Sequence, residues 1–399
     1  NDNQFTPLWN VGLRWNLHRE EFMKRWMWVD QFAVRGGFGY TGSIDKNALP
    51  FVVMTLGQSV IYDGQTVPTS FSYPNPNVKW QTKQDMNVGL DLSLFDYRLE
   101  LGVNYYNNIT RDVLDRKALP YSSGRSEVTE NVADIYNSGW EIDLGVTLLK
   151  NKSFQWYAKA NIAINDNKVK NTYYKDTKDL PKATLSNAHQ FVENQPVNGW
   201  YGYKFAGINP INGAVMTYTG NGEATLDMSV SGATWPIPSV FYLGNLTPPV
   251  VGGFSTSANW KQLIFSANFE FKTGHKIKSF NTFRSLDARN RHTSEANRWR
   301  EPGDITNVPA MSEAFTTYSS YMYDILLEKG NYLRCSYMTL GYNLKPEWLH
   351  KIGFSTARLS FTAKDLFTVS SYSGIDPALM GSFGYPNSRK YTITLNVGF

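Results

Sequence analysis

The chain has 399 residues, of which 15% are aromatic and only 18% are charged. Its formal net charge of +5 is spread along the chain without a basic block, so the composition gives no sign of a nucleic-acid-binding protein. The one cysteine, Cys335, excludes an internal disulfide framework and any cysteine-based zinc site. Few charges combined with many aromatic residues are typical of the girdled strands of an outer-membrane β-barrel.

Apolar and polar side chains alternate with a period of two in many stretches, beginning at 8–17. There Trp9, Val11 and Leu13 fall on one side of an extended chain, and Arg14 falls on the other. This alternation predicts β-strands with one apolar and one polar face. About eleven strands are expected, in chain order at 8–17, 31–42, 86–94, 99–105, 140–148, 154–162, 252–260, 263–272, 332–343, 357–364 and 389–399.

The last three stretches include two special cases. In 332–343, Arg334 and Met338 are four residues apart, so a regular strand would place this charged and this apolar side chain on the same face. A β-bulge between them would explain the pattern. The final strand alternates strictly and ends on the last residue, as expected for the closing strand of a transmembrane barrel, which meets lipid on one face and the lumen on the other. The alternative is the edge strand of a soluble sandwich. The apolar positions of this barrel-closing strand are Tyr391, Ile393, Leu395, Val397 and Phe399.

The connections between the expected strands alternate between short and long. Transmembrane barrels have this asymmetry, with short turns on the periplasmic side and long loops outside. Two helical patches in short connections, 20–28 and 345–352, place aromatic residues beside Lys and Arg. Anchoring at the membrane interface is favoured over docking of a partner for both patches. The long extracellular loops are expected at about 42–80, 108–137, 165–249, 273–331 and 367–388.

The polar faces of the expected strands carry many charges, which require a wide lumen that holds water or a polar plug. On a lipid face, one such charge at mid-depth would cost about 2–4 kcal/mol. An odd number of strands cannot close an antiparallel barrel, and an open edge in lipid leaves backbone groups unsatisfied. We therefore expect another chain, or a part of the protein before Asn1, to supply the remaining strands. The residues expected to face the lumen are Arg14, Arg35, Asp91, Arg98, Glu100, Glu141, Asp143, Lys159, Glu270 and Lys272, with Arg358 and Lys364 further along.

A series of short motifs resembles the SusC/RagA-type TonB-dependent transporters of bacterial outer membranes. The longest is Arg-Trp-Arg-Glu-Pro-Gly-Asp-Ile-Thr-Asn-Val-Pro at 298–309, which looks like the loop signature of that family. No single motif is strong alone, but their order along the chain is specific. The others lie at 75–80, 87–91, 119–124, 136–141, 203–207, 332–334, 339–342, 374–377 and 385–389.

The resemblance implies an all-β fold in which these residues form the C-terminal half of a barrel of about 22 strands with a plugged lumen. It implies a cell outer-membrane location, a SusD-like surface lipoprotein as a lid, and uptake of oligosaccharides or peptides energised through the TonB complex. The plug domain, the TonB-binding segment and the first half of the barrel have no counterpart in these residues, and energy coupling cannot be read from them.

Predicted outer loops carry aromatic residues close to polar ones, a combination that suits sugar rings or peptides. Loop packing or lid contacts are the alternative for the same side chains. The residues assigned as ligand or lid contacts are Trp200, Tyr201, Tyr203, Arg298, Trp299 and Asp304.

Catalytic and cofactor motifs are weak. Residues 37–42 fit G-x-G-x-x-G, but 43–50 offer no helix to hold a pyrophosphate, so no cofactor is expected. The histidines lack metal-ligand spacing, and Asp176 with Asp179 lack the EF-hand pattern, so no metal site is expected. Without G-x-S-x-G there is no support for a nucleophile-elbow hydrolase, and we expect no enzymatic activity.

Three functions remain open from the sequence. The leading hypothesis is a SusC-like transporter, and the second is a barrel of the same type that serves as a scaffold in an outer-membrane assembly or protein-export complex. A plug with a TonB-binding segment upstream of these residues would favour the transporter, and its absence would favour the scaffold. The third is a soluble all-β adhesin, which would appear in the aqueous fraction after membrane separation.

Overall fold

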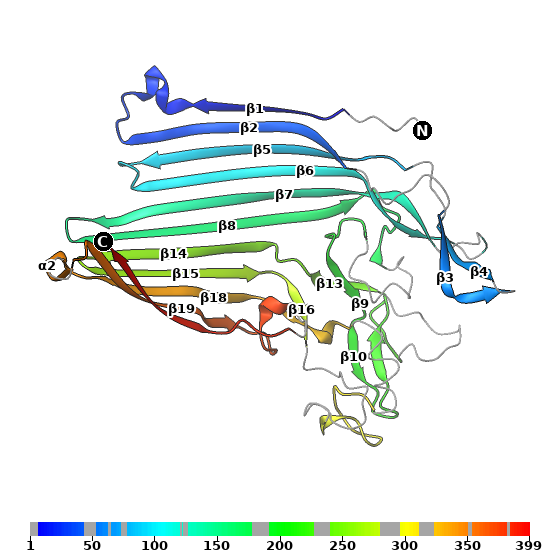
Figure 1. The fold of residues 1–399 in the computed structure, drawn as a ribbon. Helices are drawn as coiled ribbons and strands as arrows, with labels where there is room; N and C mark the ends of the chain where they lie inside the picture. The colour runs from blue at the N-terminus through cyan, green and yellow to red at the C-terminus, as the bar shows by residue number, and fades with distance from the viewer. Residues whose placement is uncertain are drawn as a thin grey trace.

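A computed structural model describes residues 7–43, 53–62, 65–72, 78–119, 122, 127–177, 191–226, 240–279, 296–310, 323–349, 353–380 and 384–399. Eleven strands form one antiparallel sheet in chain order, with β1 and β20 at its two edges (Figure 1). This is the expected number of strands. They are β1 (Trp9–Asn16), β2 (Val29–Ser43), β5 (Gln81–Leu94), β6 (Leu99–Ala118), β7 (Glu127–Lys150), β8 (Phe154–Lys170), β14 (Val250–Trp260), β15 (Leu263–Thr273), β18 (Tyr332–Asn343), β19 (Thr356–Ser370) and β20 (Lys390–Gly398).

One face of the sheet is apolar and packs against nothing else in the described chain. Residues that pair directly across antiparallel strands lie on the same face, so Val11, Phe38 and Met86 share this face. Its edge residues are strongly exposed, with Leu13 at 77% and Ile393 at 75%. An apolar surface of this extent marks contact with a partner or a membrane.

The predicted irregularity in β18 is a β-bulge. The register against β15 shifts between Asn268 and Phe269, and Ser336 is the extra residue that receives no partner. Because Glu270 pairs with Arg334 and Asn268 pairs with Tyr337, the bulge keeps both partners on the polar face. It therefore resolves the change of parity seen in the sequence.

The long connections gather at one end of the sheet and the short ones at the other (Figure 1). The first long connection contains β3 (Val53–Tyr62) and β4 (Gln65–Ser72), which pair with each other. A layer of short strands follows at the same end. It consists of β9 (Gly199–Gly202), β10 (Phe205–Ile208), β11 (Val215–Tyr218), β12 (Ala224–Leu226), β13 (Phe241–Asn245), β16 (Lys276–Lys278) and β17 (Leu327–Lys329).

The prediction of a loop at 108–137 is for the most part wrong. β6 and β7 continue as a paired ribbon until Ala118 lies opposite Glu127. Apolar and polar side chains mix on both faces here, as with Val113 and Leu114, so the alternation that reveals a strand disappears while the backbone ladder persists. The register shifts beyond Thr110, where Asp112 has φ of 56°, and the side-chain amide of Asn131 donates to Asp112 O at 2.6 Å.

The two helical patches are shorter than expected and lie at the short-turn end. The first patch, 20–28, holds the 3-10 turn η2 (Glu21–Met23), which follows η1 (Leu17–Arg19). The second holds α2 (Pro346–Leu349), with 350–352 outside the described residues. No helix in the described part of the chain has the length and apolar character needed to cross a bilayer. In the first patch, the ring of Trp28 stacks on Trp26 and on Phe95 of the next short turn, which fits the favoured interfacial anchoring.

The G-x-G-x-x-G stretch lies within β2, where its glycines relieve crowding. A Cβ on Gly39 would lie 2.7 Å from Trp9 O, whereas the nearest atom to a Cβ on Gly12 is 3.9 Å away. We expect Gly39→Ala to destabilise the β1–β2 pair by about 1–3 kcal/mol, the usual cost of overpacking. The matched change Gly12→Ala is expected to have little effect. Urea unfolding in lipid vesicles measures both, and equal destabilisation by the two changes would refute the close approach.

Candidate functional site

The second face of the sheet carries charges. The strand register places nine of the ten residues expected to face a lumen on this one face, together with Arg334, Arg358 and Lys364. The exception is Arg98, which lies in the tight turn just before β6. The nine are Arg14, Arg35, Asp91, Glu100, Glu141, Asp143, Lys159, Glu270 and Lys272.

Charges of opposite sign meet on this face. Arg14 Nη1 lies 3.1 Å from one oxygen of Asp91, and Arg35 Nη2 lies 3.6 Å from the other. Arg35 Nη2 also donates to Asn104 Oδ1 at 2.5 Å. These side chains are half-exposed, so each pair contributes little stability and mainly keeps the wall polar. Arg35 Nε is buried and makes no hydrogen bond within the described chain.

Arg334 of β18 and Asp376 of the last long connection form a buried ion pair. Arg334 is 4% exposed and Asp376 is 8% exposed, and Arg334 Nη2 lies 2.5 Å from Asp376 Oδ1. Arg334 Nε also donates to Thr368 Oγ1 at 3.1 Å, and Glu270 lies 3.9 Å from Nη1. Asp376 Oδ1 further accepts from Ala378 N at 2.9 Å, the first turn of η10 (Pro377–Leu379). The pair therefore ties the last long connection to the polar wall.

The aromatic residues assigned as ligand contacts are largely packing residues of the loop layer. Tyr201 and Tyr203 are buried in a cluster with Val215, Leu243 and Leu326. They present no surface to a ligand in this structure. Their rings form part of the small hydrophobic core of the loop layer, so loop packing accounts for them. The sequence could not distinguish these uses, since an aromatic ring suits both.

The other four assigned residues lie nearer the surface of that layer. Trp200 Nε1 donates to Lys276 O at 2.8 Å, and Trp299 Nε1 donates to Pro210 O at 3.0 Å. Asp304 accepts from the amide of Arg300 at 2.8 Å, and it therefore holds the turn of the 298–309 motif. Arg298 is partly exposed. Trp200 and Trp299 are partly buried against the cluster, so part of each side chain is taken up by packing.

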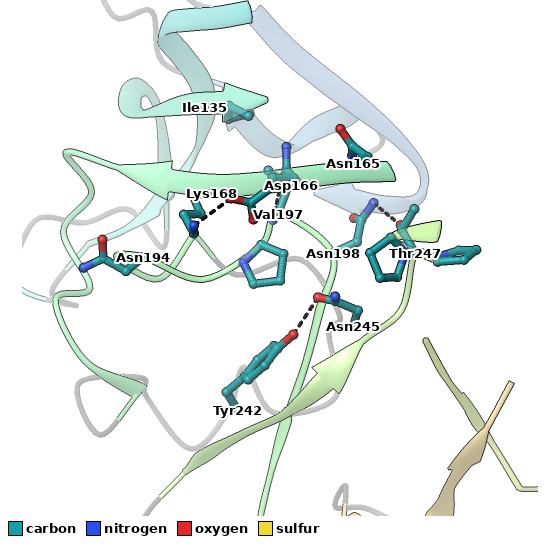
Figure 2. A pocket seen from close by; sticks show the side chains of 14 residues that line it. Ile135, Asn165, Asp166, Lys168, Asn194, Val197, Asn198, Tyr242, Asn245 and Thr247 are labelled. Atoms are coloured by element: carbon teal, nitrogen blue, oxygen red, sulfur yellow. Dashed lines mark hydrogen bonds and ion pairs between the residues drawn. The ribbon is translucent and has the colours of Figure 1, made fainter. Parts of the chain in front are cut away.

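A cavity of about 510 Å³ opens at the long-connection end, where the ends of β7 and β8 meet the loop layer (Figure 2). Most of its polar lining consists of asparagine side chains. Tyr242 donates to Asn245 Oδ1 at 2.5 Å, and Asn198 Nδ2 donates to Thr247 Oγ1 at 3.1 Å. Burial raises the pKa of Tyr242 to about 12, so its hydroxyl stays protonated and donates at neutral pH. The volume is in the range of ligand sites.

No motif in the sequence pointed to this cavity. Its asparagines come from separate segments between 165 and 249, and the only sequence signal was the high Asn, Gly and Pro content of that stretch. Their convergence depends on how β9 and β13 pair and lie against β8, which no local pattern reveals.

Comparison with known proteins decides what kind of sheet this is. Residues 1–290 match the family model described as TonB dependent receptor-like, beta-barrel. The chain belongs to this family. Its sheet is thus part of an outer-membrane β-barrel, and the resemblance to SusC/RagA-type receptors is confirmed.

Three relatives of this TonB-dependent receptor barrel cover nearly all of the chain. TonB-dependent receptor P3 of Formosa agariphila is 28% identical over 435 residues, which cover 100% of this chain and 42% of that protein. TonB-dependent receptor SusC of Bacteroides thetaiotaomicron is 22% identical over 100% of this chain and 40% of that protein. The solved structure of the RagAB peptide transporter aligns with a TM-score of 0.77 at 25% identity, over 98% of this chain and 43% of that one. The chain therefore spans about two fifths of the length of the relatives it matches.

His275 lies in the receptor barrel just beyond β15, at the base of the loop layer. Its side chain is buried against Gly330, and Nδ1 has no hydrogen-bond partner in the described chain. Burial, aided by the charge of Lys272, lowers the pKa of His275 below its ordinary value of 6.5. The folded segment therefore disfavours a proton that the unfolded segment accepts.

Acidification is expected to loosen this part of the barrel. Below about pH 6.5 the unfolded segment binds more protons than the folded one, so stability falls as pH falls. Amide exchange in β16 and β17 should speed up between about pH 7.5 and pH 5 relative to the intrinsic rate. The His275→Phe variant should lose that dependence, and a dependence that survives the change would assign it to another group.

Proposed function

We propose that this chain forms part of an outer-membrane transporter that imports oligosaccharides or peptides through a polar passage. The proposed transport is energised through TonB and gated from outside by a SusD-like lipoprotein lid. The matched relatives named as TonB-dependent receptors and the RagAB peptide transporter support this reading. This support comes from similarity over about two fifths of the length of each of these relatives.

The observation that carries the proposal is the charged face of the sheet. A wall that carries Arg14, Asp91, Glu141 and Glu270 on the side away from lipid suits water and a hydrophilic solute. We propose that the nine expected residues on this face line the passage and that Arg98 lies at its short-turn end.

Exposed residues of the loop layer are an argument for the proposed lid. Its tip presents Ile305 at 98% exposure and Ile211 at 75%, and Gly303 N donates to Pro210 O at 2.8 Å, which joins the two turns. Exposed aliphatic groups of this kind are suited to a protein contact. Two RagAB structures are described as "closed-closed" and "open-open" states of a peptide importer.

Deletion of the gene and complementation test the proposal. Radiolabelled oligosaccharide and peptide mixtures are supplied to the intact organism, with and without a protonophore. The proposal expects energised uptake of at least one substrate that is lost on deletion and restored by the gene. Uptake that deletion leaves unchanged, together with recovery of the protein from the undeleted strain in a stable membrane assembly, would instead favour the scaffold.

A further inference from the structure

We infer that the asparagine-lined cavity at the long-connection end binds a short stretch of a neutral oligosaccharide. The inference rests on the proposed transport function and specifies where and what the barrel binds. The cavity lies where β8 meets the loop layer, at the end of the sheet through which an extracellular solute would enter (Figures 1 and 2).

The polar lining of the cavity is neutral overall. The charged side chains among its described lining residues are Asp166 and Lys168, which form an ion pair of 2.7 Å with each other. Asparagine side chains supply most of the remaining polar groups. A ligand with a net charge would find no free opposite charge here, whereas a neutral ligand needs none.

Three of the asparagine side chains that line the cavity have one end of the amide held by a hydrogen bond. Tyr106 donates to Asn165 Oδ1 at 2.7 Å and Tyr242 donates to Asn245 Oδ1 at 2.5 Å, so both Nδ2 groups remain as donors. Asn198 uses its Nδ2 on Thr247, so its Oδ1 remains as an acceptor. Donors and acceptors fixed side by side match hydroxyl groups, which donate and accept at once.

The main chain around the cavity is mostly occupied, which disfavours a peptide bound by strand addition. The amide of Val197 donates to Asn167 Oδ1, and the amide of Asn165 donates to Pro249 O, each at 2.8 Å. β7 pairs with β8 as far as Lys170, but β14 covers its other edge only as far as Ile164. Beyond Ile164, Asn165 N donates to Pro249 O and Val169 N donates to Gln195 O, so only the short stretch 166–168 of that edge stays open within the described chain. Strand addition requires a free edge.

The apolar part of the lining suits sugar rings. Pro196, Pro248 and Pro249 present compact ring surfaces without amide hydrogens, and the half-buried ring of Tyr242 lies among them. Pyranose rings are apolar on their C–H faces and polar at their edges, so they use both kinds of surface.

The test is binding to an array of short neutral oligosaccharides, with sulfated and uronate-containing oligosaccharides and end-capped uncharged peptides as comparison probes. The purified full-length receptor with its native partners is used. Asn165→Asp and Asn245→Asp keep an acceptor for the tyrosine hydroxyls, and they replace each Nδ2 donor by a negatively charged carboxylate oxygen. The double variant is expected to weaken binding of the best neutral oligosaccharide roughly tenfold or more. Asn221→Asp, the same change in the exposed turn between β11 and β12, is the matched control and should leave binding unchanged.

Each outcome bears on the inference. Preference for neutral oligosaccharides, weakened by the double variant and not by the control, supports it. Preference for peptides or for anionic oligosaccharides overturns the ligand class, and neutral binding that the double variant leaves intact overturns the site. Energised uptake that depends on the gene, without array binding at this cavity, would refute the inference and leave the proposed transport standing. Loss of such uptake altogether would refute the transport proposal itself.

Discussion

Replacing Asp376 by asparagine is expected to release the last long connection from the barrel wall. Arg334 would keep its charge while buried, with only the more distant Glu270 to compensate it. Breaking a buried pair in this way costs about 3–5 kcal/mol. Hydrogen exchange of the amides at 371–380 measures the effect as a large acceleration of local opening.

Two further variants show whether the ion pair is the cause. Glu347→Gln removes a charge from exposed α2 at the opposite end and should leave exchange at 371–380 unchanged. Arg334→Met combined with Asp376→Leu removes both charges and should recover much of the loss, since an apolar pair avoids desolvation of the ions. Slow exchange in Asp376→Asn would show that the hydrogen bonds of Ser373 to Glu328 hold the connection instead.

Placing an arginine on the apolar face is expected to prevent stable insertion of the barrel. Leu144 lies on that face, midway between Trp140 at one end and Trp156 of β8 at the other. Aromatic residues mark the two membrane interfaces, so Leu144 lies near the middle of the bilayer. Leu144→Arg should cost about 2–4 kcal/mol, measured by urea unfolding in lipid vesicles.

The same charge on the other face provides the control. Asn161 pairs with Asp143 on the polar face, at nearly the same depth as Leu144. Asn161→Arg should change stability by no more than about 0.5 kcal/mol, as for an ordinary wetted position. A similar loss of unfolding free energy in the two variants would mean that both faces of the sheet contact the same kind of environment, against the account.

The strands were predictable because two different solvents constrain alternate side chains. β18 begins and ends where the alternation predicted, and even its bulge followed from the parity of Arg334 and Met338. The same rule failed beyond Thr110, where β6 and β7 carry apolar residues on both faces and Val132 and Ala133 pack against Val169 of β8.

The candidate site was less predictable because its parts come from distant segments. Arg334 and Asp376 were noticed only within separate motifs, and nothing local shows that they meet. Tyr201 and Tyr203 lie in loops by sequence, yet the loops build a core of their own around them. The cavity asparagines become a set only through tertiary packing, so sequence alone left them as ordinary loop residues.

Cysteine scanning of β7 tests the central claim, that hydrocarbon contacts one face of this sheet and water the other. Glu141, Ile142, Asp143 and Leu144 are replaced by cysteine one at a time, with the buried Cys335 changed to alanine. A water-soluble thiol reagent should label positions 141 and 143, and a nitroxide-bearing lipid should quench a fluorophore at 142 and 144. Uniform labelling along the strand, or no lipid quenching at 142 and 144, would contradict the account.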